Sequence, residues 1–142
     1  MKPSFALHAQ LAADTLPVGD FPLCRLLLMN DAQYPWCILV PRIAGAKELH
    51  RLDDAEQLQV LRESVALSRA MELLFKPHKM NLAALGNMVP QLHLHHIARY
   101  KGDPAWPAPV WGRHPALAYE PGVADERIRQ LQQALPGLAA PV

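Results

Sequence analysis

Residues 81–99 read NLAALGNMVPQLHLHHIAR. Its apolar runs predict two strands, over 80–85 and 91–97, around a turn at Gly86-Asn87. Alternation along the second strand separates its side chains into two sets. One set supplies core: Leu92 and Leu94, with His96 on the same side. The other set lines up polar groups on a side that we expect not to be buried: Gln91, His93 and His95.

The charges around these histidines are all positive. No carboxylate lies between Leu73 and Gly102, and the charged residues there are cations: Lys76, Lys79, Arg99 and Lys101. Imidazoles and cations together suit an anion, and phosphate above all. Backbone N–H groups in the turn at residues 86–88 are placed to bind phosphate oxygens as well.

Two other interpretations of the histidines stay open at this point. His-x-His on a strand is also a zinc arrangement, which here needs a distant carboxylate such as Glu48 or Asp103. The histidines can also be exposed strand residues without a function. Three within four positions, in a segment without acidic residues, favour a function.

The flanking sequence predicts an α+β architecture. Apolar runs at 21–29 and 36–40, joined by a polar turn, predict an antiparallel hairpin, whereas Pro17 and Gly19 predict a turn or loop over 14–20. A long helix is expected over 53–75, with Asp53 and Glu56 as a capping box. One long helix between the second and third strands favours an antiparallel sheet over a βαβ series.

The C-terminal part of the sequence has a different character. Lys101 to Pro115 is rich in Pro and Trp without periodicity, so we predict an extended ordered loop there. Helical spacing returns between Asp125 and Leu135. Pro136 and Gly137 then end the pattern.

Composition excludes several classes of protein. A length of 142 residues indicates one domain, and 14 basic against 13 acidic residues argue against nucleic-acid binding or a polybasic membrane anchor. The longest aliphatic run, 26–29, is far too short to cross a bilayer. Without a signal-like N-terminus we expect a cytoplasmic protein, with Cys24 and Cys37 as buried thiols.

The stretch from Asn81 to Arg99 resembles the signature of the histidine-triad (HIT) superfamily. That pattern is H-φ-H-φ-H-φ-φ, often followed by Pro-Arg, with a Gly-containing turn and an Asn upstream. The resemblance covers about residues 20–100, and points in particular to bacterial proteins like diadenosine polyphosphate hydrolases. It implies an α+β HIT-like domain over 1–115, with an antiparallel sheet of about five strands, one long helix and short helices. A C-terminal tail with a short helix is expected over 116–142.

The resemblance also implies a reaction. His93 would attack the α-phosphorus of a dinucleoside polyphosphate or nucleoside phosphoramidate, forming a nucleotidyl-imidazole that water hydrolyses. His95 would bind phosphate and manage protons. Residues expected to contact phosphate or nucleotide are Asn30, Asn87, Met88 and Arg99, the last of which can equally anchor the strand end. The resemblance implies a homodimer in which the two subunits extend one sheet. It implies neither a metal nor a cofactor.

The sequence departs from the family pattern at the first triad position. Gln91 stands where the pattern has histidine, and the preceding strand lacks the further histidine expected near Cys37. Glutamine can hydrogen-bond but cannot titrate. His96 replaces an apolar residue. A nucleotide-binding protein with little turnover therefore remains an alternative to a hydrolase, and a zinc-binding strand protein is a second one.

Overall fold

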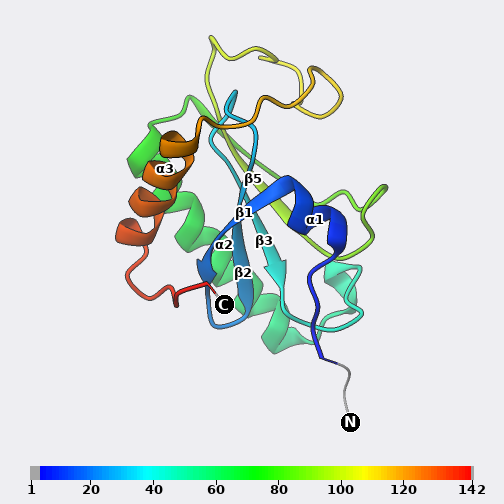
Figure 1. The fold of residues 1–142 in the computed structure, drawn as a ribbon. Helices are drawn as coiled ribbons and strands as arrows, with labels where there is room; N and C mark the ends of the chain where they lie inside the picture. Colours follow the sequence, from blue (N-terminus) through cyan, green and yellow to red (C-terminus); the bar gives the residue numbers. More distant parts are fainter. Residues whose placement is uncertain (1–3, 142) are drawn as a thin grey trace.

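A computed structural model describes residues 4–141, which build a five-stranded sheet with helices on both faces (Figure 1). All neighbouring strands are antiparallel, in the order β1-β2-β3-β5-β4. The strands are β1 (Thr15–Asp20), β2 (Cys24–Met29), β3 (Trp36–Pro41), β4 (Lys79–Ala83) and β5 (Leu94–Arg99). The helices are α1 (Ala9–Asp14), α2 (Asp54–Phe75), α3 (Pro121–Ala134) and the short 3-10 helix η1 (Leu49–Arg51). The predicted α+β class, the five strands and the β2–β3 hairpin are confirmed.

Strand β1 corrects the prediction of a turn over 14–20. Pro17 is tolerated because β1 is an edge strand, where a missing N–H need not interrupt a ladder. The register with β2 shifts between Pro17 and Gly19, as in a β-bulge. Gly19 is needed because a Cβ there would come within 2.6 Å of the carbonyl oxygen of Ala139. The Pro and Gly that indicated a turn therefore mark a bulged edge strand.

One face of the sheet packs against α2 and α3. Leu39 of β3 and Ala98 of β5 share a core cluster with Leu67 of α2 and Leu131 of α3. The expected capping box is confirmed at the start of α2, where Asp53 and Glu56 each bond the other's backbone N–H. The apolar side chains of α2 and α3 thus form one hydrophobic core with this face of the sheet.

The opposite face is covered by α1 and by the loop over 101–115 (Figure 1). A second cluster here joins Leu11 of α1 and Val110 of the loop to Ile38 and Ile97 of the sheet. Cover on this face therefore comes from segments far apart in the sequence.

The C-terminal segment returns to the sheet. Helix α3 begins at Pro121 rather than at Asp125 and lies beside α2 (Figure 1). Beyond it, Ala139 forms a bridge with Asp20, through backbone hydrogen bonds of 2.8 and 2.9 Å. In the part of the chain that the structure describes, no helix is long and apolar enough to cross a membrane.

The strand that carries the histidines is shorter than predicted. β5 begins at Leu94, so residues 91–93 lie in the connection from β4 and not in the sheet. Gly86 in this connection has φ of 88°, a left-handed conformation that favours glycine. His93 is therefore positioned by a loop and His95 by a strand.

Candidate active site

The structure brings His93 and His95 together. Their rings meet edge to face with centroids 4.8 Å apart, although only His95 belongs to a strand. The prediction that this side is not buried is wrong: His93 is 7% exposed and His95 6%. Both lie on the face that α1 and the 101–115 loop cover, and this cover explains their burial.

A backbone carbonyl orients the His93 ring. Nδ1 of His93 lies 2.6 Å from the carbonyl oxygen of Gln91. A carbonyl can only accept, so Nδ1 carries the proton and donates it. In the neutral ring Nε2 then holds a lone pair, which makes it the nucleophilic nitrogen.

The His95 ring has the opposite tautomer. The indole N–H of Trp36 donates to its Nδ1 at 3.0 Å, so the proton of neutral His95 sits on Nε2. Burial, followed by the nearby His93 and His96, lowers the pKa of His95 to about 3. His95 is therefore a neutral N–H donor at physiological pH, and its ring lies next to that of His93.

Two cavities meet at His93. The first, of about 350 Å³, also contains His95 and is lined mainly by apolar side chains: Leu11, Met29, Trp36, Ile38, Val89 and Trp111. The second, of about 360 Å³, is more polar and is lined in part by Lys47, His50, Gln57 and Gln91. The imidazole pair thus opens to an apolar cavity, and His93 alone also borders a polar one.

The side chain of Gln91 does not point at His93 or His95. Its Oε1 accepts from the backbone N–H of His8 at 2.8 Å, and its Nε2 donates to the carbonyl of Ala6 at 2.9 Å. The amide therefore holds the N-terminal segment next to the site. Only the backbone carbonyl of Gln91 reaches His93.

The predicted phosphate-binding turn borders the first cavity. Gly86, Asn87 and Met88 all line it, and the Met88 side chain is almost fully exposed. These three residues are therefore brought together with His93 and His95.

Two other predicted residues lie elsewhere. Asn30 accepts a hydrogen bond from the backbone N–H of Tyr119 and does not line the cavity. Arg99 is enclosed and donates to Asp103, to Asn81 and to the carbonyl of Ala108. The geometry of Arg99 is that of a strand-end anchor. The predicted cluster of cations is also not at the site, since none of these side chains lines either cavity: Lys76, Lys79, Arg99 and Lys101.

Two residues at the site are not anticipated from the sequence. Trp36 was assigned only to a strand, and Asp14, which borders the first cavity, only to a turn. For Trp111, in the Pro- and Trp-rich loop, the sequence leaves two roles open, cover over the site or packing on a partner subunit. The structure places it over the site, edge-on against His95 with ring centroids 5.1 Å apart. No local pattern links these residues to the histidines, because they come from distant parts of the chain.

His96 lies on the other face of the sheet, as predicted. Its Nδ1 donates to the carbonyl of Leu94, so its Nε2 accepts from the Ser64 hydroxyl of α2 at 2.7 Å. The ring is fully buried, and burial lowers its pKa to about 4, partly offset by the Leu94 carbonyl. His96 thus joins α2 to β5 behind the site.

This burial predicts a dependence of stability on pH. The unfolded chain protonates His96 near its ordinary pKa of about 6.5, whereas the folded chain does so only near 4. Between these values the unfolded state binds more protons, so stability decreases as the pH is lowered. We expect the double substitution His96→Leu, Ser64→Ala to reduce this slope by up to about 1.4 kcal/mol per pH unit. Urea titrations at several pH values measure it, and equal slopes would contradict the assignment.

Metal ligation requires more than the histidine pair. Within residues 4–141, no group of three or more His, Cys, Asp or Glu side chains is placed to hold a metal ion. The carboxylate of Asp103 is bonded to Arg99 instead. The described residues therefore offer the zinc alternative no third ligand.

Comparison with known proteins agrees with this geometry. The family model for the HIT domain matches residues 10–102, which include His93, His95 and the turn before them. None of the curated proteins matches the chain.

Solved structures of bacterial histidine triad proteins are similar over nearly the whole chain. One from Marinobacter aquaeolei is 53% identical, with a TM-score of 0.93, and the match covers 96% of this chain and 100% of that one. One from Bradyrhizobium japonicum is 45% identical, with a TM-score of 0.91 and coverage of 93% and 98%. One from Sinorhizobium meliloti is 37% identical, with a TM-score of 0.90 and coverage of 92% and 97%. The matches thus extend past the HIT domain into α3.

Proposed function

Because the chain belongs to the HIT domain family, we propose that it is a hydrolase or transferase acting at the α-phosphate of a nucleotide through His93. HIT proteins generally bind nucleotides and act as hydrolases or transferases. The substrate is a dinucleoside polyphosphate or a nucleoside phosphoramidate. The observation that carries the proposal is the Nδ1–H of His93 on the Gln91 carbonyl, which leaves Nε2 free to attack.

The proposed reaction has two displacements. The Nε2 lone pair of His93 forms a bond to the α-phosphorus, and the bond to the leaving group breaks with its electron pair. The ring becomes a nucleotidyl-imidazolium, whose positive charge the Gln91 carbonyl stabilises. Water then attacks phosphorus, the N–P bond breaks, and the nucleoside monophosphate leaves. His95 assists by donating its Nε2–H to a phosphate oxygen, which needs no charged imidazole.

The surroundings of His93 support each part of this assignment. The apolar cavity next to the histidines suits a nucleobase, and the turn at Asn87 and Met88 suits phosphate. Gln91 is compatible with turnover, because its backbone carbonyl does the orienting and every residue type has one. The replaced imidazole at position 91 is therefore not required to place His93.

A homodimer through the β4 edge is part of the proposal. β4 is an edge strand of the sheet, and exposed apolar side chains lie on it and on α2: Leu82, Leu58, Leu61 and Val65. Such an edge favours pairing with a second copy. Sedimentation that gives the mass of one chain would contradict this part.

The experiment that tests the function is a product assay on metal-free protein. An adenosine phosphoramidate and a diadenosine polyphosphate are supplied in parallel, and released AMP is measured. We expect AMP from at least one of them, and the preferred substrate identifies the leaving group. Preference for the diadenosine polyphosphate would indicate a diadenosine polyphosphate hydrolase.

Binding of AMP is measured on the same protein. AMP that binds without any product from either substrate would overturn the hydrolase and indicate a nucleotide-binding protein. Stoichiometric zinc, whose removal by a chelator lowers stability, would instead indicate the zinc-binding alternative.

A further inference from the structure

We propose that Trp36 is a positioning residue, whose indole N–H fixes the His95 tautomer and so turns His95 into a permanent N–H donor for the phosphate. The inference rests on the proposed function for its catalytic meaning. It rests on the geometry of β3 and β5 for the hydrogen bond itself.

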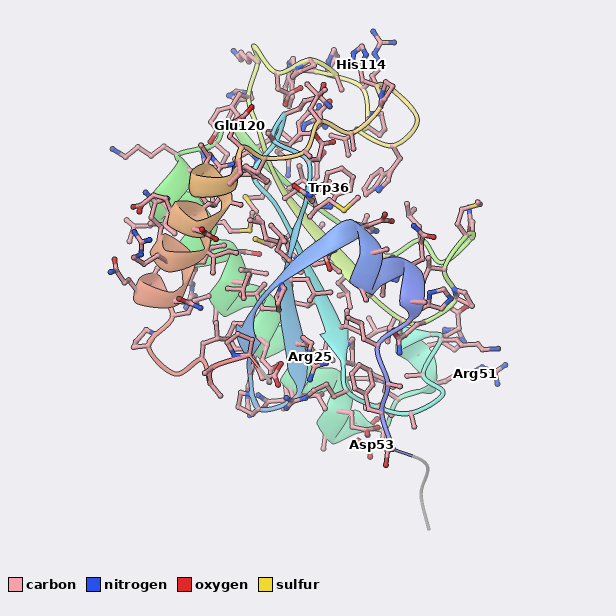
Figure 2. The ribbon with its side chains drawn as sticks, in the orientation of Figure 1. Arg25, Trp36, Arg51, Asp53, His114 and Glu120 are labelled. Carbon is pink, nitrogen blue, oxygen red and sulfur yellow. The ribbon has the colours of Figure 1, made fainter. Side chains whose placement is uncertain are left out.

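The hydrogen bond is built into the sheet. Trp36 begins β3 and pairs with Ile97 of β5, while His95 pairs with Ile38, so both side chains emerge on the same face. The indole Nε1 lies 3.0 Å from Nδ1 of His95, and both residues are buried. Figure 2 shows Trp36 at the end of the sheet nearest the loop that carries His114. Neighbouring antiparallel strands therefore hold donor and acceptor in place.

The chemistry of indole makes this contact directional. Trp can only donate, so a proton on Nδ1 of His95 would point at another N–H. Both the Nδ1–H tautomer and the doubly protonated ring are disfavoured in this way. The remaining form has its proton on Nε2, and among the described residues nothing accepts that proton.

The two histidines are thereby given complementary roles by different partners. A carbonyl forces the His93 proton onto Nδ1, and an indole forces the His95 proton onto Nε2. The outcome is one nitrogen base and one N–H donor on rings 4.8 Å apart, bordering the same cavity. Nucleophile and phosphate donor are thus set before a substrate arrives.

The chain contains a matched pair of tryptophans for the test. Trp111 also contacts the His95 ring, but its indole N–H is buried without a hydrogen-bond partner. Trp36→Phe removes a donated hydrogen bond, and Trp111→Phe removes an N–H that bonds nothing in the described chain. Both substitutions keep an aromatic ring next to His95.

Nitrogen-15 NMR of the histidine rings reports the tautomer directly, and AMP release reports the rate. In the wild type we expect His95 to carry its proton on Nε2. Trp36→Phe should introduce the Nδ1–H form and lower kcat by roughly ten- to a hundredfold with a smaller change in KM, whereas Trp111→Phe should keep the tautomer.

Wild-type His95 with its proton on Nδ1 would overturn the inference, and this measurement needs no variant. A Trp36→Phe protein with an unchanged tautomer and unchanged kcat would overturn it as well. The wild-type spectrum does not depend on turnover. A protein that releases no AMP but shows the Nε2–H tautomer would therefore contradict the proposed function and leave the role of Trp36 in orienting His95 intact.

Discussion

The His93→Asn protein is expected to fold normally and to lose AMP release by roughly a thousandfold or more, the scale of removing a catalytic nucleophile. Of the two histidines that border the cavity, His93 alone has a nitrogen lone pair free to attack, because the free nitrogen of His95 carries a proton. Asparagine keeps a polar side chain of similar reach but has no nucleophilic nitrogen. AMP binding should persist, because the cavity and the turn are unchanged. Steady-state release of AMP, with a binding titration beside it, measures both.

A suitable control is His50→Asn. His50 is exposed and borders only the second cavity, so the same substitution there should leave turnover within about twofold and stability within about 0.5 kcal/mol. The stability of His93→Asn itself should change by at most about 1 kcal/mol, because its one intramolecular hydrogen bond is to a loop carbonyl. Normal turnover in the folded His93→Asn protein would exclude the covalent mechanism.

The placement of the histidines could be predicted from spacing alone. His93 does lie on the same side as His95, and His96 points to the other face of β5, as alternation along the strand requires of His95 and His96. The predicted strand was nevertheless too long, because residues 91–93 bond to the N-terminal segment and to each other instead of to β3. The contacts of Gln91 with the N-terminal segment span more than eighty residues, and no local pattern encodes them.

The predicted cationic site shows why charge counted along the sequence can mislead. β4 and β5 form an antiparallel pair in which Lys79 lies opposite Arg99, while Ala83 lies opposite His95. The cations therefore lie at one end of the β4–β5 strand pair, and the histidines lie at the other end, toward the connecting loop. Proximity in sequence put them in one site, and the pairing separates them.

The partner of His95 could not be inferred for a related reason. Trp36 and His95 are 59 residues apart, and their contact depends on β3 pairing with β5 rather than with β4. The sequence indicates each strand but not their order in the sheet. The tautomer of the second histidine thus follows from topology.

Loss of the Arg99 side chain is expected to give the largest change in stability. Arg99→Met should lower the free energy of unfolding by about 3 to 5 kcal/mol, because it removes one partner of a buried ion pair. The side chains of Arg99 and Asp103 are 1% and 3% exposed, and the guanidinium donates to Asp103 through two nitrogens, at 2.8 and 3.1 Å. Chemical denaturation at neutral pH measures the loss.

The chain offers an exposed pair as the control. Arg129 and Glu126 form an ion pair with both side chains more than half exposed, so Arg129→Met should cost at most about 1 kcal/mol. A loss from Arg99→Met no greater than that of Arg129→Met would contradict the argument. Substituting Asp103→Leu as well should recover part of the loss, since no unpaired buried charge then remains.

Lowering the pH should narrow the difference in free energy of unfolding between the wild type and Arg99→Met. Burial raises the pKa of Asp103, but hydrogen bonds from Arg99 and from the backbone N–H groups of Tyr100 and Trp106 outweigh it, so the pKa lies below its ordinary value. In the wild type this contribution is present above the unfolded pKa of about 4 and is lost as the pH falls through the lower folded value. In the variant, burial without Arg99 favours the neutral acid, so protonation relieves the unpaired charge. Arg99 also donates to the carbonyl of Ala108, in the loop that carries Trp111. The variant at neutral pH should therefore lose the packing of Trp111 on His95 together with its stability.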